Sequence, residues 1–315
     1  MHLAVYLTLL VAAGLVPAAL SGCPRLAPRA AAGTLVAAAA AAAAGWVGAL
    51  AMLAATLADA APGGASVLGF RMASDPVPWW VAAIALLLLA AACVRLAAAA
   101  GGALRRVRAN HAALSACRAV AGELLVVADP HPVAYALPSL VAGPGRIVVS
   151  TGMLAALDAE QRAVLLAHER SHLRNRHSWL RGAMTLAVAA HPLCSPLGAQ
   201  LDTALERWAD EDSAGAVSSR RAAARSVGGA ALAALKLTPP PPAPTRGTAA
   251  RPRRPAAGVP ARVAALCGEA PRSNWLPAVA IAALLAVMVV TATEATRDLE
   301  TLFDPGSHVT AGPSS

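Results

Sequence analysis

One stretch of the chain decides how the rest of it is interpreted: Ala163-Val164-Leu165-Leu166-Ala167-His168-Glu169-Arg170-Ser171-His172. It follows Asp158, a candidate helix N-cap with Gln161 three positions later, so a helix is expected from Ala159 to about Asn175. Side chains four positions apart lie on one helix face, so both imidazoles of the stretch can reach a single metal ion. The glutamate between them can hydrogen-bond to a water molecule instead of the metal. This H-E-x-x-H pattern is typical of two zinc ligands with a general base.

A second acidic motif supplies candidates for a third ligand. Glu206 and Asp210 are four positions apart on a helix expected around residues 201–214, so they share a face. A catalytic zinc site needs a third protein ligand and an open position. One carboxylate can therefore bind the metal while the other accepts a hydrogen bond from a ligand histidine. Taken alone, the motif fits a solvated acidic face; together with the histidine pair, it favours a metal site.

These residues resemble the integral-membrane gluzincin peptidases. That group includes the HtpX-like and CAAX-protease-like enzymes and the BlaR/MecR-type antibiotic sensors (metallopeptidase families 48 and 56). The resemblance rests on H-E-x-x-H followed by E-x-x-x-D, on residues 147–154 (IVVSTGML) and on His191-Pro192, and it covers about residues 130–214. It implies one Zn²⁺ per chain, with His168, His172 and Glu206 as metal ligands, Glu169 as catalytic base and Asp210 as the residue that orients a ligand.

The composition favours a membrane protein with one soluble domain. Of the 315 residues, 57% are hydrophobic and 14% are charged, against about 25% charged in globular domains. A mean hydropathy of +0.57 excludes a disordered chain. Five cysteines in 315 residues are sparse and odd in number, which excludes a disulfide-rich secreted fold.

Four charge-free runs are long enough to cross a bilayer, which takes roughly 20 apolar residues: 1–24, 30–58, 76–94 and 273–293. The second run is mostly alanine and fits a helix buried among the others equally well. In the first run, residues 20–23 (LSGC) fit a lipoprotein cleavage box. Because no Lys or Arg precedes Arg25, an uncleaved span is favoured there.

Basic residues near the span ends predict the orientation. Arg25 and Arg29 lie between the first two spans, and four arginines follow the third: Arg95, Arg105, Arg106 and Arg108. Both segments are therefore expected in the cytoplasm, with the active site facing the cytoplasm from a multi-pass protein of the bacterial plasma membrane. The tail after the last span is expected to be too short for the extracellular sensor of the BlaR/MecR type.

The expected fold is mainly α, with about four transmembrane helices and a cytoplasmic α+β zincin-like metallopeptidase domain. Its parts are a membrane region with three spans (1–101), the peptidase domain (102–237), a Pro/Arg-rich linker (238–262) and a last span with a short tail (263–315). Strands are expected at 124–127 and 147–150. The second is either an edge strand open to an extended substrate or, equally well, an interior strand. The charge-free run 182–201 is expected to form a packed hairpin, because a crossing there would separate Glu206 from the two histidines.

The sequence therefore predicts a membrane-embedded zinc endopeptidase that hydrolyses protein substrates with metal-activated water. The alternative is a sensor-less signalling peptidase of the BlaR/MecR type that cleaves a repressor or itself when partners engage the spans. Expected partners are a protein or peptide substrate, the lipid bilayer and a membrane signalling protein. Nucleic acid is not expected, because aromatic residues are scarce. His177, His191 and Tyr135 are further candidates for stabilising the oxyanion, although an ordinary polar role is favoured for each.

Overall fold

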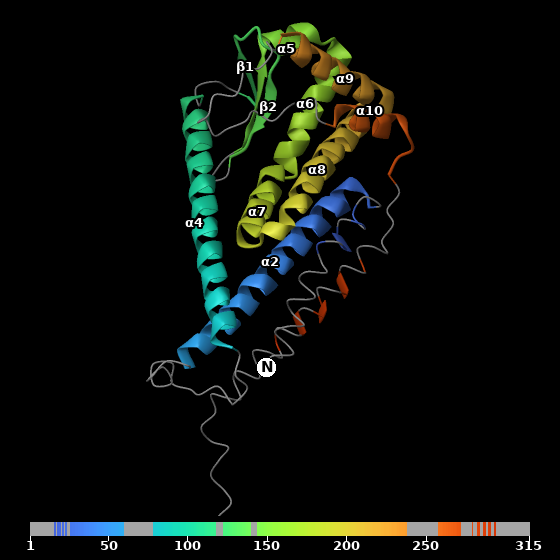
Figure 1. Cartoon of the computed structure of the whole chain (residues 1–315). Coiled ribbons are helices and arrows are strands. Elements are labelled where there is room, and N and C mark those ends of the chain that lie inside the picture. The colour runs from blue at the N-terminus through green and yellow to red at the C-terminus, as the bar shows by residue number, and fades with distance from the viewer. Residues whose placement is uncertain are drawn as a thin grey trace, which may run out of the picture.

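The computed structural model describes residues 26–59, 78–117, 122–139, 144–237 and 258–271, with isolated positions between 16 and 23 and between 279 and 293. Within these residues the chain is mostly helical, with one small three-stranded sheet (Figure 1). The mainly α class with an α+β domain is thus confirmed. The expected spans at 1–24 and 273–293 lie almost wholly outside the described residues.

Two helices are long and apolar enough to cross a membrane by length and composition: α2 (Pro28–Asp59) and α4 (Trp79–Ala116). They coincide with the expected second and third spans. The alanine-rich α2 is nearly half buried, because its small side chains pack against α4, α7 and α8. In contrast, α4 leaves large apolar side chains exposed, with Trp79 and Leu87 each at 70%. It also continues past residue 101, the expected boundary between the membrane region and the peptidase domain, as one helix to Ala116.

The sheet contains β1 (Leu124–Val127), β2 (Ala134–Leu137) and β3 (Arg146–Ser150) in the order β1-β3-β2. β3 pairs in parallel with β1 and antiparallel with β2. The strands at β1 and β3 confirm the sequence prediction, and of the two alternatives for residues 147–150, the interior strand is correct. β3 is the buried central strand, and β2, which the sequence did not predict, forms the edge that contacts α6.

Ser150 fixes the junction between β3 and α5 (Thr151–Ala156). Its hydroxyl accepts hydrogen bonds from the backbone of Met153 (3.0 Å) and Val133 (2.9 Å) and donates one to the carbonyl of His131 (2.6 Å). At Gly152, an added Cβ would lie 2.0 Å from the carbonyl oxygen of Pro130, so no larger residue fits there. These contacts hold the loop before β2 against the end of the central strand.

Three helices carry the residues of the metal motif. α6 (Ala159–Arg174) begins at the expected capping box, since Asp158 and Gln161 each bond the other's backbone N–H. α7 (His177–Ala190), the short 3₁₀ helix η2 (Pro192–Cys194) and α8 (Ser195–Ala216) then form a helical hairpin. The hairpin packs on α2 through an apolar cluster, and Arg95 of α4 donates to the carbonyl of Val188 (3.0 Å). The expectation of a packed hairpin at 182–201 is therefore confirmed.

Two further helices cover α6 and α8: α9 (Arg220–Leu237) and α10 (Val259–Cys267). Arg220 ties them together by donating to the carbonyls of Ala265 (2.7 Å) and Leu266 (3.2 Å) at the end of α10. The Pro/Arg-rich linker was expected to reach residue 262. Its last part is instead the first turn of α10, which packs into the domain.

Candidate metal centre

The structure brings the three expected ligands together although they come from two helices. His168 and His172 lie one turn apart on α6, with their Nε2 atoms separated by 3.1 Å. Glu206 approaches from α8, with carboxylate oxygens 3.5 Å from Nε2 of His168 and 3.8 Å from Nε2 of His172. The helix periodicity of each motif and the packing of α6 on α8 create this convergence.

The three side chains lie close enough to hold one metal ion. With one ligand atom taken from each residue, the two Nε2 atoms and a carboxylate oxygen of Glu206 all lie within 4.8 Å of one another. Tetrahedral zinc ligands at bond lengths of about 2.0–2.1 Å lie roughly 3.3 Å apart, so the side chains are close to the spacing that zinc needs. Two imidazole nitrogens and one carboxylate oxygen form a common donor set for a catalytic zinc, which keeps one position open. Within the described residues, this is the one group of three such side chains close enough to hold an ion.

Asp210 contacts His168 at the ring nitrogen that does not face the other two expected ligands. Its carboxylate lies 3.1 Å from Nδ1 of His168, one α8 turn beyond Glu206, and its side chain is only 2% exposed. Arg262 of α10 binds the same carboxylate through two hydrogen bonds, of 2.7 Å from Nε and 2.6 Å from Nη2. Burial opposes a charge on Asp210, but the hydrogen bonds from Arg262 and His168 outweigh burial and lower its pKa. Asp210 is therefore an ionised carboxylate within hydrogen-bond distance of His168.

Two arginines also contact the third ligand. Arg181 of α7 donates to Glu206 at 2.9 Å and to Asp202 at 3.1 Å. The Nη1 atom of Arg262 lies 3.3 Å from the other oxygen of Glu206. Burial opposes the charge, but the neighbouring histidines and Arg262 hold the pKa of Glu206 well below its usual range. The carboxylate is thus available as an anionic ligand at any physiological pH.

Glu169 lies beside the ligands and is almost fully buried against β2. Burial raises its pKa, although a backbone hydrogen bond from Ala136 and the charge on His168 oppose this. A carboxylate with a raised pKa holds a proton more readily than an exposed one. Its position and its proton affinity both suit an acceptor of a proton from water.

The two ligand histidines differ sharply in their proton affinity. Burial opposes a charge on His168, but hydrogen bonds with Asp210 and Glu206 outweigh it and raise its pKa to about 9. Burial and the charge on His168 lower the pKa of His172 to about 2. Without a metal, His168 therefore holds a proton at neutral pH and His172 does not.

Of the three residues considered for stabilising an oxyanion, His177 and His191 are buried, in keeping with the ordinary polar role that the sequence favoured for them. His177 is fully buried and bonds Nδ1 of His172 (2.7 Å), on the opposite ring edge from the Nε2 atom that faces the other ligands. His191 is buried at the end of α7, where it stacks on Trp46 with ring centroids 4.8 Å apart. Tyr135 lies partly exposed on the edge strand β2 and stays a prediction.

Arg262 and Arg181 contact the site, and the sequence interpretation did not find them; His177 had been considered only as a candidate for stabilising the oxyanion. Arg262 had been counted with the solvated basic linker. A local signal marked its helix, because Gly258 precedes a proline in the first turn, a common start of an α-helix. No spacing rule links it to Asp210, which is 52 positions away, so only the fold could reveal the pair.

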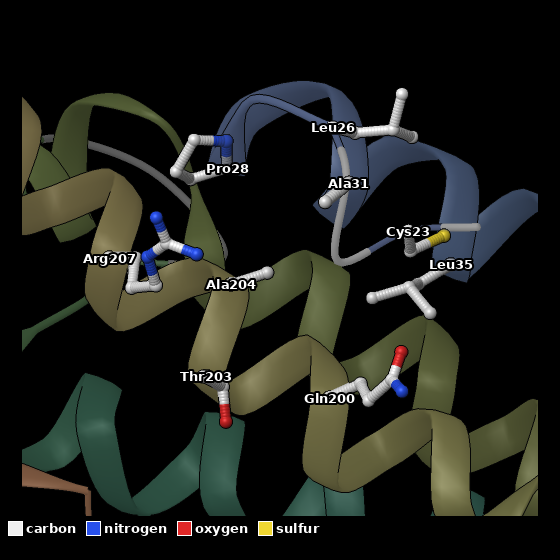
Figure 2. A pocket seen from close by; sticks show the side chains of 9 residues that line it. All are labelled: Cys23, Leu26, Pro28, Ala31, Leu35, Gln200, Thr203, Ala204 and Arg207. Atoms are coloured by element: carbon white, nitrogen blue, oxygen red, sulfur yellow. The ribbon is translucent and has the colours of Figure 1, made fainter. Parts of the chain in front are cut away.

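A small pocket of about 150 Å³ lies away from this centre. Figure 2 shows polar side chains of α8 facing small and apolar side chains at the start of α2. The lining consists of Cys23, Leu26, Pro28, Ala31, Leu35, Gln200, Thr203, Ala204 and Arg207. It contains none of the metal-site residues, so it is separate from the chemistry described above.

Two packed helices bring an H-E-x-x-H pair together with a Glu and an Asp four positions apart, an arrangement that could hold a metal ion and is typical of metallopeptidases. Residues 83–233 match the family model of Peptidase family M48. The match extends over all five expected site residues and supports a peptidase, a hydrolase of a family that is typically zinc-dependent. Arg262 lies outside it. No curated protein and no solved structure matches the chain.

Proposed function

We propose that this protein is a membrane-embedded, zinc-dependent endopeptidase that hydrolyses peptide bonds of protein substrates. The observation that carries the proposal is the convergence of His168, His172 and Glu206 donor atoms, with Asp210 behind the first histidine. The match of the surrounding residues to a peptidase family supports the same reaction.

One Zn²⁺ per chain is held by His168, His172 and Glu206. When bound, the ion supplies a Lewis acid that polarises the scissile carbonyl and makes water acidic enough to attack near neutral pH. The chain's own contribution is to fix the ligands. Asp210 and Arg262 hold one imidazole, and Arg181 holds the carboxylate of Glu206.

Glu169 is the general base in this proposal. It takes the proton from the attacking water and then passes it to the leaving amine. Its burial supports the assignment, because a raised pKa brings a carboxylate closer to the pH at which proton transfer in both directions is efficient.

An extended substrate segment adds to the sheet at β2. This strand pairs with β3 on one side only and contacts α6, the helix of the H-E-x-x-H motif. The backbone of Ala136 reaches Glu169, so a peptide along this edge passes directly beside the base. Edge-strand addition supplies affinity from main-chain hydrogen bonds and tolerates many side chains.

The bacterial plasma membrane is the proposed location, with the centre facing the cytoplasm. The exposed apolar side chains of α4 near Trp79 and Leu87 suit lipid contact, and the basic residues of the same helix begin at Arg95. Because Arg95 bonds the hairpin at Val188, the domain is tied to α4 at the end of its apolar part.

The test is made on the full chain purified in detergent. We expect about one zinc per chain and cleavage of an unstructured protein, loss of cleavage after removal of zinc by a chelator, and recovery on adding zinc. Zinc-dependent cleavage restricted to one protein or to the chain itself would favour the signalling peptidase of the BlaR/MecR type. A chain that binds no zinc would contradict the proposed function.

A further inference from the structure

A break between α6 and α7 brings His177 next to the second metal ligand. In an uninterrupted α-helix, residues five positions apart differ by about 140° around the axis, so His177 and His172 would face different sides. The left-handed backbone of Arg176 (φ 52°) separates the two helices instead. As a result, Nδ1 of His177 lies 2.7 Å from Nδ1 of His172.

The hydrogen bond has a defined direction once His172 acts as a ligand. Its Nε2 atom faces His168 and Glu206, so Nε2 is the donor atom toward the metal. A histidine that binds a metal through Nε2 carries its proton on Nδ1 and needs an acceptor there. Nδ1 of His177 is in position to be that acceptor.

The surroundings of His177 agree with this tautomer. An imidazole that accepts at Nδ1 carries its own proton on Nε2. Nε2 of His177 is buried and has no hydrogen-bond partner among the described residues. Its ring lies 4.8 Å from the ring of Trp208, centroid to centroid, at a tilt of 52°, so the indole packs against this imidazole.

We propose that His177 is the positioning residue of the second metal ligand. By accepting the Nδ1 proton of His172, it holds that imidazole with Nε2 toward the metal, as Asp210 does for His168. His177 does not face the substrate and acts only through His172. The inference rests on the proposed function, because His172 needs orienting only where a metal is bound.

Two variants of the full chain separate hydrogen bonding from packing. His177→Asn keeps an acceptor near the place of Nδ1 but loses the ring against Trp208, whereas His177→Phe keeps a ring and loses the acceptor. Zinc affinity is measured by competition with a chelator, and the visible spectrum of the Co²⁺ form reports ligand geometry. We expect His177→Phe to bind zinc about 10–100-fold more weakly, with an altered spectrum, and His177→Asn to stay close to the wild type.

The opposite order, with His177→Phe normal and His177→Asn weak, would show that only ring packing matters and would overturn the proposal. Equal affinities in all three proteins would overturn it too. His177→Leu, which also lacks an acceptor, replaces His177→Phe if that variant does not fold. A wild type that binds no zinc would overturn the proposed function along with this inference, whereas normal zinc binding with the wrong order overturns the positioning role alone.

Discussion

The two ligand histidines sit on the same helix, yet different kinds of structure support them. His168 lies within hydrogen-bond distance of Asp210, whose buried carboxylate is bound by Arg262 of α10. Arg262 is 52 positions further along the chain than Asp210. His172 forms a hydrogen bond with His177, which is only five positions later in the sequence. The left-handed backbone of Arg176 brings the two imidazoles together. The support of His168 by Asp210 and Arg262 is charged and depends on tertiary packing. The support of His172 by His177 is uncharged and comes from residues close in sequence. We therefore expect the site to respond differently when each support is removed.

Loss of Glu206, the expected third metal ligand, should have the largest effect on zinc binding, because its carboxylate lies beside both histidines. We expect Glu206→Ala to leave the protein without bound zinc and without peptidase activity, since two imidazoles alone do not complete the donor set. Metal content and cleavage after dialysis check this. Asp202→Ala is the matched control, because Asp202 contacts Arg181 but lies outside the donor set; equal zinc loss in both variants would contradict the ligand assignment.

Removing Arg262, which supports His168 through Asp210, should lower both the stability of the protein and its affinity for zinc. Arg262→Leu leaves the buried carboxylate of Asp210 without its bidentate partner, and such a change lowers the free energy of unfolding by about 3–5 kcal/mol. Arg225→Leu is the control, since the exposed pair of Arg225 with Glu160 is worth about 0–1 kcal/mol. Denaturant unfolding of the zinc-free proteins measures both values, and a similar loss in the two would show that Arg262 is an ordinary surface cation.

The interaction of His168 with Asp210 also predicts how zinc affinity depends on pH. The pKa of His168 is raised to about 9, so in the zinc-free protein its proton is held below pH 9 and must leave when zinc binds. Apparent affinity should therefore rise about tenfold per pH unit between pH 7 and 9 and level off above. In Asp210→Asn the levelling should begin at lower pH. Titrations with a zinc chelator at several pH values check this, and a flat profile from pH 7 to 9 would contradict it.

Local signals allowed much of the centre to be predicted from the sequence. The capping box at Asp158 fixed the start of α6, and the spacing of four positions placed each pair of site residues on one face. Those two patterns are sufficient because helix periodicity alone determines the geometry within each motif. The length of the charge-free runs identified α2 and the apolar first part of α4.

The remaining parts depend on contacts that no short pattern encodes. β2 is only four residues long, and its role follows from pairing with β3 rather than from its own sequence. The link from Arg262 to Asp210 requires α10 to pack against α8. His177 reaches His172 because Arg176 adopts a left-handed conformation, which its residue type does not favour. Tertiary packing decided the first two features, and an unusual local backbone conformation decided the third.

The central claim is that Glu169 acts on water while its neighbours bind the metal, and Glu169→Gln tests it most directly. The amide keeps the size of the side chain but cannot accept the proton. We predict that zinc content stays at about one per chain, as in the control Glu160→Gln, while cleavage of an unstructured protein falls by about 10²–10⁴-fold. Undiminished cleavage, or loss of zinc together with activity, would contradict the account.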